Sequence, residues 1–171
     1  MSFDINSLPI SKNLTEISVL LSKEPYLVLK AEPGAGKSTA VPLYLLKHLD
    51  LGGKKIIMLE PRRLAARSIA EFLAAQLDER VGQTVGYQVR NERKVSAATQ
   101  LEIVTEGILN TRIQADPELH DIGLIIFDEF HVLLIDNNSS NFCQIMFIDF
   151  LKNTKLLSLV YKQINWGVLV M

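Results

Sequence analysis

Two short segments of this 171-residue chain carry residue types that could bind a nucleoside triphosphate and act on it. The first, residues 31–39, places two glycines just before Lys37 and Ser38. Glycines let the backbone turn tightly and point successive N–H groups at phosphate oxygens. The Lys37 ammonium could then reach the outer phosphates, and the Ser38 hydroxyl could ligate Mg²⁺. The predicted nucleotide contacts are Pro33, Gly34, Ala35, Gly36, Lys37, Ser38 and Thr39.

The second segment, residues 128–131, follows an apolar run at 122–127 that has the unbroken hydrophobicity of a strand buried on both faces. In open parallel sheets, ligands bind at the carboxyl ends of the strands. Asp128 is therefore expected to hold Mg²⁺ through water, and Glu129 to polarise the attacking water. The predicted catalytic residues are Lys37, Asp128 and Glu129, and the predicted metal ligands are Ser38 and Asp128.

Each segment also has a simpler interpretation. A glycine-rich stretch can be an ordinary turn, and Asp-Glu after a strand can be the start of a solvated loop. The context favours nucleotide binding, because the first segment lies between a strand-like run at 26–29 and a helix-like stretch at 39–49. Ala31 replaces the first glycine that such loops usually carry, which is a small change where a strand ends.

Strand-like and helix-like stretches alternate along the first part of the chain, which predicts an α/β fold with a parallel sheet. Ser11 is a candidate N-cap for the first helix. The expected strands are 26–29, 56–59, 84–90, 101–104 and 123–127, and the expected helices are 11–23, 39–49, 62–77 and 106–114.

Composition limits the classes of protein to consider. With 171 residues and 48% hydrophobic content, the chain can build one domain with a substantial core. The net charge of −1 gives no global attraction to nucleic acid, so such binding requires a local patch. Cys143 is the single cysteine, which excludes an intrachain disulfide. No signal peptide or membrane-spanning stretch is expected, so we predict a cytoplasmic protein without a membrane partner.

The character of the chain changes at about residue 132. The last forty residues contain no alanine, glutamate or arginine, whereas the first 131 contain eleven alanines and seven arginines. Such a shift suggests either a foreign segment or a change of reading frame. The predicted division is residues 1–131 as a nucleotide-binding domain and residues 132–171 as a divergent tail.

Four ordered motifs resemble the first RecA-like domain of DEAH-type superfamily 2 helicases, and most closely their bacterial HrpB-like branch. The resemblance covers about residues 8–131. It rests on residues 34–39 as motif I, 60–67 as motif Ia, 104–109 as motif Ib and 128–131 as motif II. It implies a RecA-like domain that binds ATP with Mg²⁺ and couples hydrolysis to nucleic-acid unwinding.

The resemblance also implies a groove for the backbone of single-stranded RNA or DNA, and it gives His131 the role of coupling the nucleotide state to a partner domain. The two adjacent arginines agree with such a groove, because forked guanidinium groups and free N–H groups at a helix start both suit phosphate. The alternative is that the adjacent arginines face solvent or pair with Glu60. The implied nucleic-acid contacts are Arg62, Arg63, Thr105 and Gly107.

The chain also departs from the family pattern. After His131 the family continues with Glu-Arg and later with a strand that ends in Ser-Ala-Thr, whereas this chain has Val132 next and no Ser-Ala-Thr. That strand normally lies between the phosphate-loop strand and the strand ending in Asp128. Its loss would leave both neighbours without a hydrogen-bonding partner and prone to aggregate. Residues 155–161 are the expected replacement, with residues 142–151 as a covering helix.

The second RecA-like domain of the family is absent as well. In the family it supplies an arginine finger, a contribution on the order of 10³–10⁵ in rate. The sequence therefore predicts an incomplete RecA-like fold that binds Mg-ATP, binds single strands weakly, and hydrolyses ATP inefficiently or not at all. A nucleotide-gated interaction module and a non-functional fragment remain alternatives. A kinase is disfavoured because it leaves motifs Ia and Ib unexplained, and the choice of RNA or DNA and the oligomeric state stay open.

Overall fold

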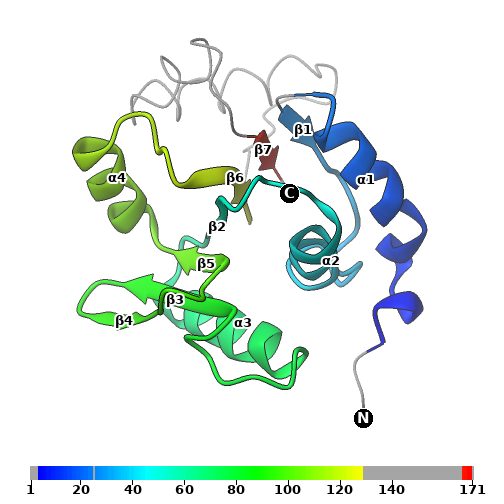
Figure 1. Ribbon diagram of the computed structural model, residues 1–171. Helices are drawn as coiled ribbons and strands as arrows, with labels where there is room; N and C mark the ends of the chain where they lie inside the picture. The colour runs from blue at the N-terminus through cyan, green and yellow to red at the C-terminus, as the bar shows by residue number, and fades with distance from the viewer. Residues whose placement is uncertain (1–3, 25, 129–166, 171) are drawn as a thin grey trace, which may run out of the picture.

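The computed structural model describes residues 4–24, 26–128 and 167–170, which form a seven-stranded sheet flanked by helices (Figure 1). The strand order is β1-β7-β6-β2-β5-β3-β4. Every pairing is parallel except the hairpin of β3 and β4, so the predicted α/β fold with a mainly parallel sheet is confirmed. The strands are β1 (Tyr26–Val28), β2 (Lys55–Leu59), β3 (Val85–Val89), β4 (Glu92–Lys94), β5 (Leu101–Val104), β6 (Ile122–Phe127) and β7 (Gly167–Val170).

Helices cover both faces of this sheet. Along β2, Ile56 and Met58 pack into one core with α1, α2 and α3, whereas the buried Ile57 between them belongs to the opposite face, where α4 lies. In the described ranges, no helix combines the length and hydropathy that a membrane span requires. The helices are η1 (Ile5–Ser7), η2 (Pro9–Asn13), α1 (Leu14–Leu21), α2 (Ala40–His48), α3 (Arg63–Ala75) and α4 (Glu106–Ala115).

Strand β7 occupies the position between β1 and β6 (Figure 1). It pairs in parallel with both neighbours, through registers that join Val170 to Val28 on one side and to Phe127 on the other. The expectation that some tail segment fills this position is therefore confirmed, but the choice of residues 155–161 is wrong. Main-chain hydrogen bonding makes few demands on side-chain identity, so apolar content alone could not distinguish two candidate segments. The helix expected at 142–151 lies outside the described residues.

Two local predictions also differ from the structure. Ser11 is not an N-cap, because Pro9 begins the short helix η2 and α1 starts only at Leu14. The Ser11 hydroxyl donates instead to the Asn6 carbonyl at 3.2 Å. Strand β4 was not expected, since all three of its residues are charged. It lies at the edge of the sheet, where charged side chains can face solvent.

Removing residues 167–171 should destabilise the sheet, because β1 and β6 would lose the strand that both pair with. We expect faster amide hydrogen exchange in β1 and β6, together with concentration-dependent aggregation seen by light scattering. The control is removal of Met171 alone, which leaves Gly167–Val170 intact. Unchanged exchange in the shorter chain would show that β7 does not support its neighbours.

Candidate nucleotide and nucleic-acid site

The carboxyl ends of five strands form one row along an edge of the sheet. Val28 of β1 and Phe127 of β6 pair with Val170 of β7. On the other side of β6, Leu59 of β2 pairs with Phe127 and with Val104 of β5. The loops that follow these strands carry every predicted site residue that the structure describes. Such an edge is where ligands of open α/β sheets bind.

Two glycines with positive φ shape the loop after β1. Gly34 has φ 76° and Gly36 has φ 101°, a backbone region that favours glycine. Gly36 is also crowded: an added Cβ would lie 2.7 Å from Leu8 Cδ1 and 3.1 Å from Ile10 Cγ2. A Cβ on Gly34 would meet nothing within 4 Å. Backbone conformation favours glycine at both positions, and at position 36 an added Cβ would in addition displace the Leu8 side chain and press on Ile10.

The residues of η2 anchor the loop. The Ile10 N–H donates to the Ala35 carbonyl at 3.2 Å, and both residues are only 4% exposed. Sequence reasoning gave this segment no part in the site, and Pro9 ahead of a helix was the one weak signal available. The loop conformation therefore depends on a segment more than twenty residues upstream of it.

Several N–H groups of the loop are available to an anion. Within the described part of the chain, those of Gly34, Gly36, Lys37 and Ser38 donate to no protein acceptor. The N–H groups of residues 39–41 all converge on the Gly36 carbonyl, at 2.8–3.3 Å, as α2 begins. Unpaired N–H groups beside a helix N-terminus form a concave site that suits phosphate oxygens. The arrangement fits the predicted role of residues 33–39.

Lys37 adds positive charge to the same loop. Its ammonium donates to the Ala31 carbonyl at 2.6 Å and to the Glu32 carbonyl at 2.9 Å. The half-buried Ser38 follows it directly. These two carbonyls hold the lysine close to the N–H groups, and no carboxylate competes for it among the contacts of the described residues. A phosphate that binds Lys37 would replace the two carbonyls.

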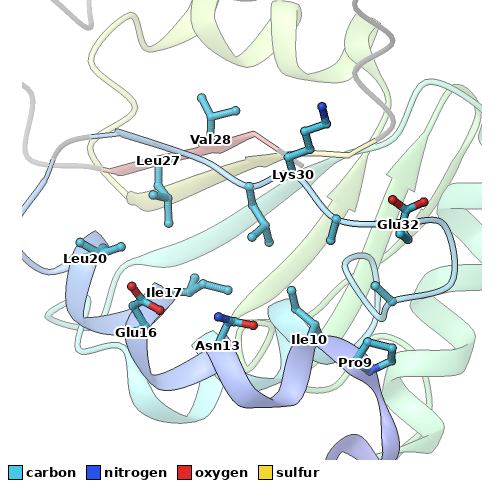
Figure 2. A pocket seen from close by; sticks show the side chains of 13 residues that line it. Pro9, Ile10, Asn13, Glu16, Ile17, Leu20, Leu27, Val28, Lys30 and Glu32 are labelled. Atoms are coloured by element: carbon cyan, nitrogen blue, oxygen red, sulfur yellow. The ribbon is translucent and has the colours of Figure 1, made fainter. Parts of the chain in front are cut away.

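A cavity of about 420 Å³ lies beside the loop, between α1 and β1 (Figure 2). Its lining is mostly apolar, with Ile17 and Leu20 of α1 on one side and Leu27 of β1 on the other. Lys37 and Ser38 are not among the lining residues. The candidate phosphate site is therefore the loop itself and not this cavity.

Asp128 lies two strands away from the loop. It follows β6, is 5% exposed, and extends the ladder by one residue because its N–H donates to the Leu59 carbonyl at 3.1 Å. Since β7 separates β6 from β1, the two elements are about 10 Å apart at the sheet edge. A hydrated Mg²⁺ held between carboxylate and phosphate fits a separation of this order. Glu129 and His131 lie outside the described residues.

The predicted nucleic-acid contacts follow β2 and β5, which are neighbours in the sheet. Arg62 and Arg63 are exposed at the start of α3, whereas Glu60 is only 1% exposed. The exposed guanidinium groups favour the solvent-facing arrangement over pairing with Glu60. Thr105 precedes α4 and does not use its hydroxyl as a cap, and Gly107 has open space around its Cα.

The structure adds a basic turn that sequence reasoning missed. Residues 90 and 91 join β3 to β4, and Gln88 of β3 pairs with Val104 of β5, so the turn lies at the same edge beside Thr105. Asn91 adopts φ 68°, a conformation that asparagine tolerates better than most residues. An Arg-Asn pair between two short alternating segments was the signal available in the sequence.

Polar contacts fix this hairpin to α3. Arg67 of α3 lies 3.8 Å from Glu92 of β4 and donates to Glu71 at 2.9 Å. The buried Tyr87 donates to the same Glu92 carboxylate at 2.5 Å. Burial and this hydrogen bond raise the pKa of Tyr87 to about 12, and the hydrogen bond to Glu71 raises the pKa of Arg67. The start of α3 and the hairpin are therefore held together.

Five exposed arginines gather along these elements, and we call them the basic edge. They are five of the seven arginines in a chain whose net charge is −1. The elements that follow β2 and β3 thus carry most of the arginines, although Arg67 is paired with Glu71 and Glu92. The basic edge consists of Arg62, Arg63, Arg67, Arg90 and Arg93.

A parallel sheet with a glycine-lysine loop after one strand and a buried aspartate two strands away defines a RecA-like nucleotide-binding domain. The family model described as DEAD/DEAH box helicase matches residues 14–158. The chain belongs to the DEAD/DEAH box helicase family.

Individual relatives agree with this assignment. The ATP-dependent RNA helicase HrpB of Escherichia coli K12 is 52% identical over 127 residues, which cover 74% of this chain and 16% of that protein. The HrpA homolog of Haemophilus influenzae is 38% identical over 135 residues, or 77% of this chain and 10% of that protein. The crystal structure of the E. coli DEAH/RHA helicase HrpB superposes with a TM-score of 0.80 at 43% identity, covering 96% of this chain and 20% of that one. The chain thus spans a small part of the length of these relatives.

Gly36→Ala should destabilise the protein more than Gly34→Ala. Both substitutions force a non-glycine residue into a left-handed conformation, at a cost of about 1–2 kcal/mol. Only Gly36→Ala also crowds Leu8 and Ile10, and overpacking of this kind adds about 1–3 kcal/mol. Thermal unfolding of the two variants beside the wild type measures the difference. Equal losses of Tm would show that η2 does not press against the loop.

Proposed function

We propose that this chain is the nucleotide-binding part of an ATP-dependent RNA helicase, and that it binds Mg-ATP at residues 31–39. One observation carries the proposal: within the described residues, four N–H groups of the loop lack a protein acceptor beside Lys37. The relatives named above are ATP-dependent RNA helicases, which supports ATP and RNA as the ligands.

Each loop residue has a distinct part in this proposal. The backbone N–H groups of residues 34–38 hold the outer phosphates, with Lys37 as a point charge on them. The Ser38 hydroxyl and the Asp128 carboxylate would hold Mg²⁺, and the ion would supply positive charge next to the phosphates. Glu129 orients and polarises the attacking water. Burial of Asp128 at the strand end supports its part, because a carboxylate shielded from solvent interacts more strongly with a cation.

The second part of the proposal is a groove for the backbone of single-stranded RNA. Arg62 and Arg63 follow β2, Thr105 and Gly107 follow β5, and the turn at Arg90 follows β3, so three adjacent strands present their contacts in order along one edge. Phosphate contacts of this kind give affinity that falls with salt and carry no sequence preference.

We propose that the chain is catalytically incomplete. The chain matches 16% of the length of HrpB, and the arginine finger and the second half of the groove that the family resemblance implies lie outside the matched part. Residues 1–131 form the nucleotide-binding domain, and residues 132–171 are a divergent tail that supplies β7 to the same sheet. As the family resemblance implies, His131 would couple the nucleotide state to a partner domain. Hydrolysis by this chain alone is slow or absent.

Lys37→Ala should weaken Mg-ATP binding by about tenfold or more, because a charge-assisted contact to phosphate is lost. Isothermal titration calorimetry with purified chain in Mg²⁺ measures this. Lys30→Ala is the matched control, since Lys30 is an exposed lysine that lies two residues after β1 and ahead of the loop. A parallel steady-state assay should find negligible ATP turnover with or without single-stranded RNA.

Each other result has a definite meaning. Robust RNA-stimulated turnover would refute the incompleteness of the chain. Absence of Mg-ATP binding by the wild type would refute the nucleotide site and favour a non-functional fragment. Nucleotide-dependent binding of a protein partner without affinity for RNA would favour the interaction module.

Arg90→Ala should lower the affinity for a fluorescein-labelled oligouridylate and reduce the slope of log affinity against log salt by about 0.7, the value for one phosphate contact on a single strand. Fluorescence anisotropy over a salt series measures both quantities. Arg80→Ala is the matched control, because Arg80 is equally exposed but precedes β3 and so belongs to the opposite edge of the sheet. Equal losses in the two variants would indicate diffuse attraction without a groove.

A further inference from the structure

Arg112 ties three elements together beneath the proposed RNA groove. It belongs to the last turn of α4, and its Nη2 donates to the Gln88 side-chain oxygen of β3 at 2.8 Å. The same nitrogen donates to the Glu102 carboxylate of β5. The Glu102 side chain is 3% exposed and that of Arg112 is 25% exposed, so the ion pair is largely shielded from water. A shielded pair with a further neutral acceptor has a well-defined geometry.

Other contacts of α4 with the sheet are few. Of its ten residues only Leu109 and Ile113 are buried. An amphipathic helix normally buries a stripe of three to four residues in every two turns, so apolar packing alone holds α4 loosely. The contacts of the Arg112 guanidinium with Gln88 and Glu102 therefore add to a small apolar contact in fixing the direction of α4.

The elements that Arg112 joins are the ones that carry proposed RNA contacts. Thr105 and Gly107 lie at the start of α4, and the turn at Arg90 comes two residues after Gln88. Glu102 and Gln88 belong to strands that pair directly, with Gln88 opposite Val104. The β3–β5 ladder sets the distance between Thr105 and Arg90. The Arg112 contact adds a constraint on the direction in which α4, with Gly107 in its first turn, leaves this ladder, and that direction must suit the phosphates of a bound strand.

We propose that Arg112 is a positioning residue for RNA: it fixes the direction of α4 relative to the β3–β4 turn, so that Thr105, Gly107 and Arg90 engage one backbone together. This inference rests on the proposed RNA groove. Arg112 itself contacts Glu102 and Gln88, and the proposed phosphate contacts are made by the other residues.

The test is a double-mutant cycle on the full chain, with fluorescein-labelled oligouridylate followed by anisotropy. Arg112→Met keeps much of the side-chain length and removes the guanidinium group that contacts Gln88 and Glu102. We expect it to lower RNA affinity by about tenfold in the wild-type background but by less than about twofold when Arg90→Ala is already present, because coupled contacts are not additive. Mg-ATP affinity, measured by calorimetry, should stay within about twofold, since the phosphate loop lies at the far end of the sheet edge.

Each other outcome overturns the inference. The same loss of RNA affinity in both backgrounds, or a matching loss of Mg-ATP affinity, would show a merely structural role. Unchanged RNA affinity in Arg112→Met, with normal binding by the wild type, would refute the positioning role alone. No RNA binding by the wild type would refute the groove and the inference together.

A second variant covers the case in which Arg112→Met does not fold. Glu102→Gln preserves the shape of the acceptor and removes its charge. It should lower RNA affinity by about threefold and leave Mg-ATP affinity unchanged, because a neutral acceptor holds the guanidinium group less firmly. No change in RNA affinity in a folded Glu102→Gln chain would refute the positioning role.

Discussion

The parallel pairing of β7 with β1 and β6 is the interaction on which the rest of this structure depends. Strand β1 leads into the phosphate loop and β6 leads to Asp128, and neither pairs with the other directly. Val170 is the common partner that brings their ends, at Val28 and Phe127, into one row. Because the ladder consists of main-chain hydrogen bonds, a short strand can complete it without the Ser-Ala-Thr sequence typical of the family. The relative position of the two halves of the nucleotide site therefore depends on the completed sheet.

The two halves of the site are built from different chemistry. The proposed phosphate loop would bind through backbone N–H groups whose directions are set by Gly34 and Gly36, and it packs against residues at the start of η2. The proposed RNA side would bind through exposed guanidinium groups, and polar contacts between neighbouring elements hold those elements in place. Arg67 connects α3 to the hairpin and Arg112 connects α4 to the sheet. In both halves, the residues that would contact the ligand are held in place by a second layer of residues that would not contact it.

Much of the fold follows from local patterns. The strands at residues 56–59, 101–104 and 123–127 were predicted from apolar runs to within a residue or two, since a strand buried on both faces needs apolar side chains at nearly every position. The start of α2 was predicted to within one residue from the glycine-lysine loop ahead of it. Polar elements were missed: β4 has no apolar signal, and the short helix that begins at Pro9 displaced Ser11 from its expected cap.

The sequence by itself determined the class of this protein and the residues of its phosphate loop. A phosphate loop needs glycine, lysine and serine at fixed spacing along a few residues, and this requirement can be recognised without knowledge of distant contacts. Only the tertiary structure decided which tail segment completes the sheet, since backbone pairing accepts many apolar sequences. It also decided that η2 supports the loop and that Arg90 and Arg112 belong with the motif residues. Such contacts join positions far apart in the chain, and their partners are chosen by packing and burial rather than by spacing along the sequence.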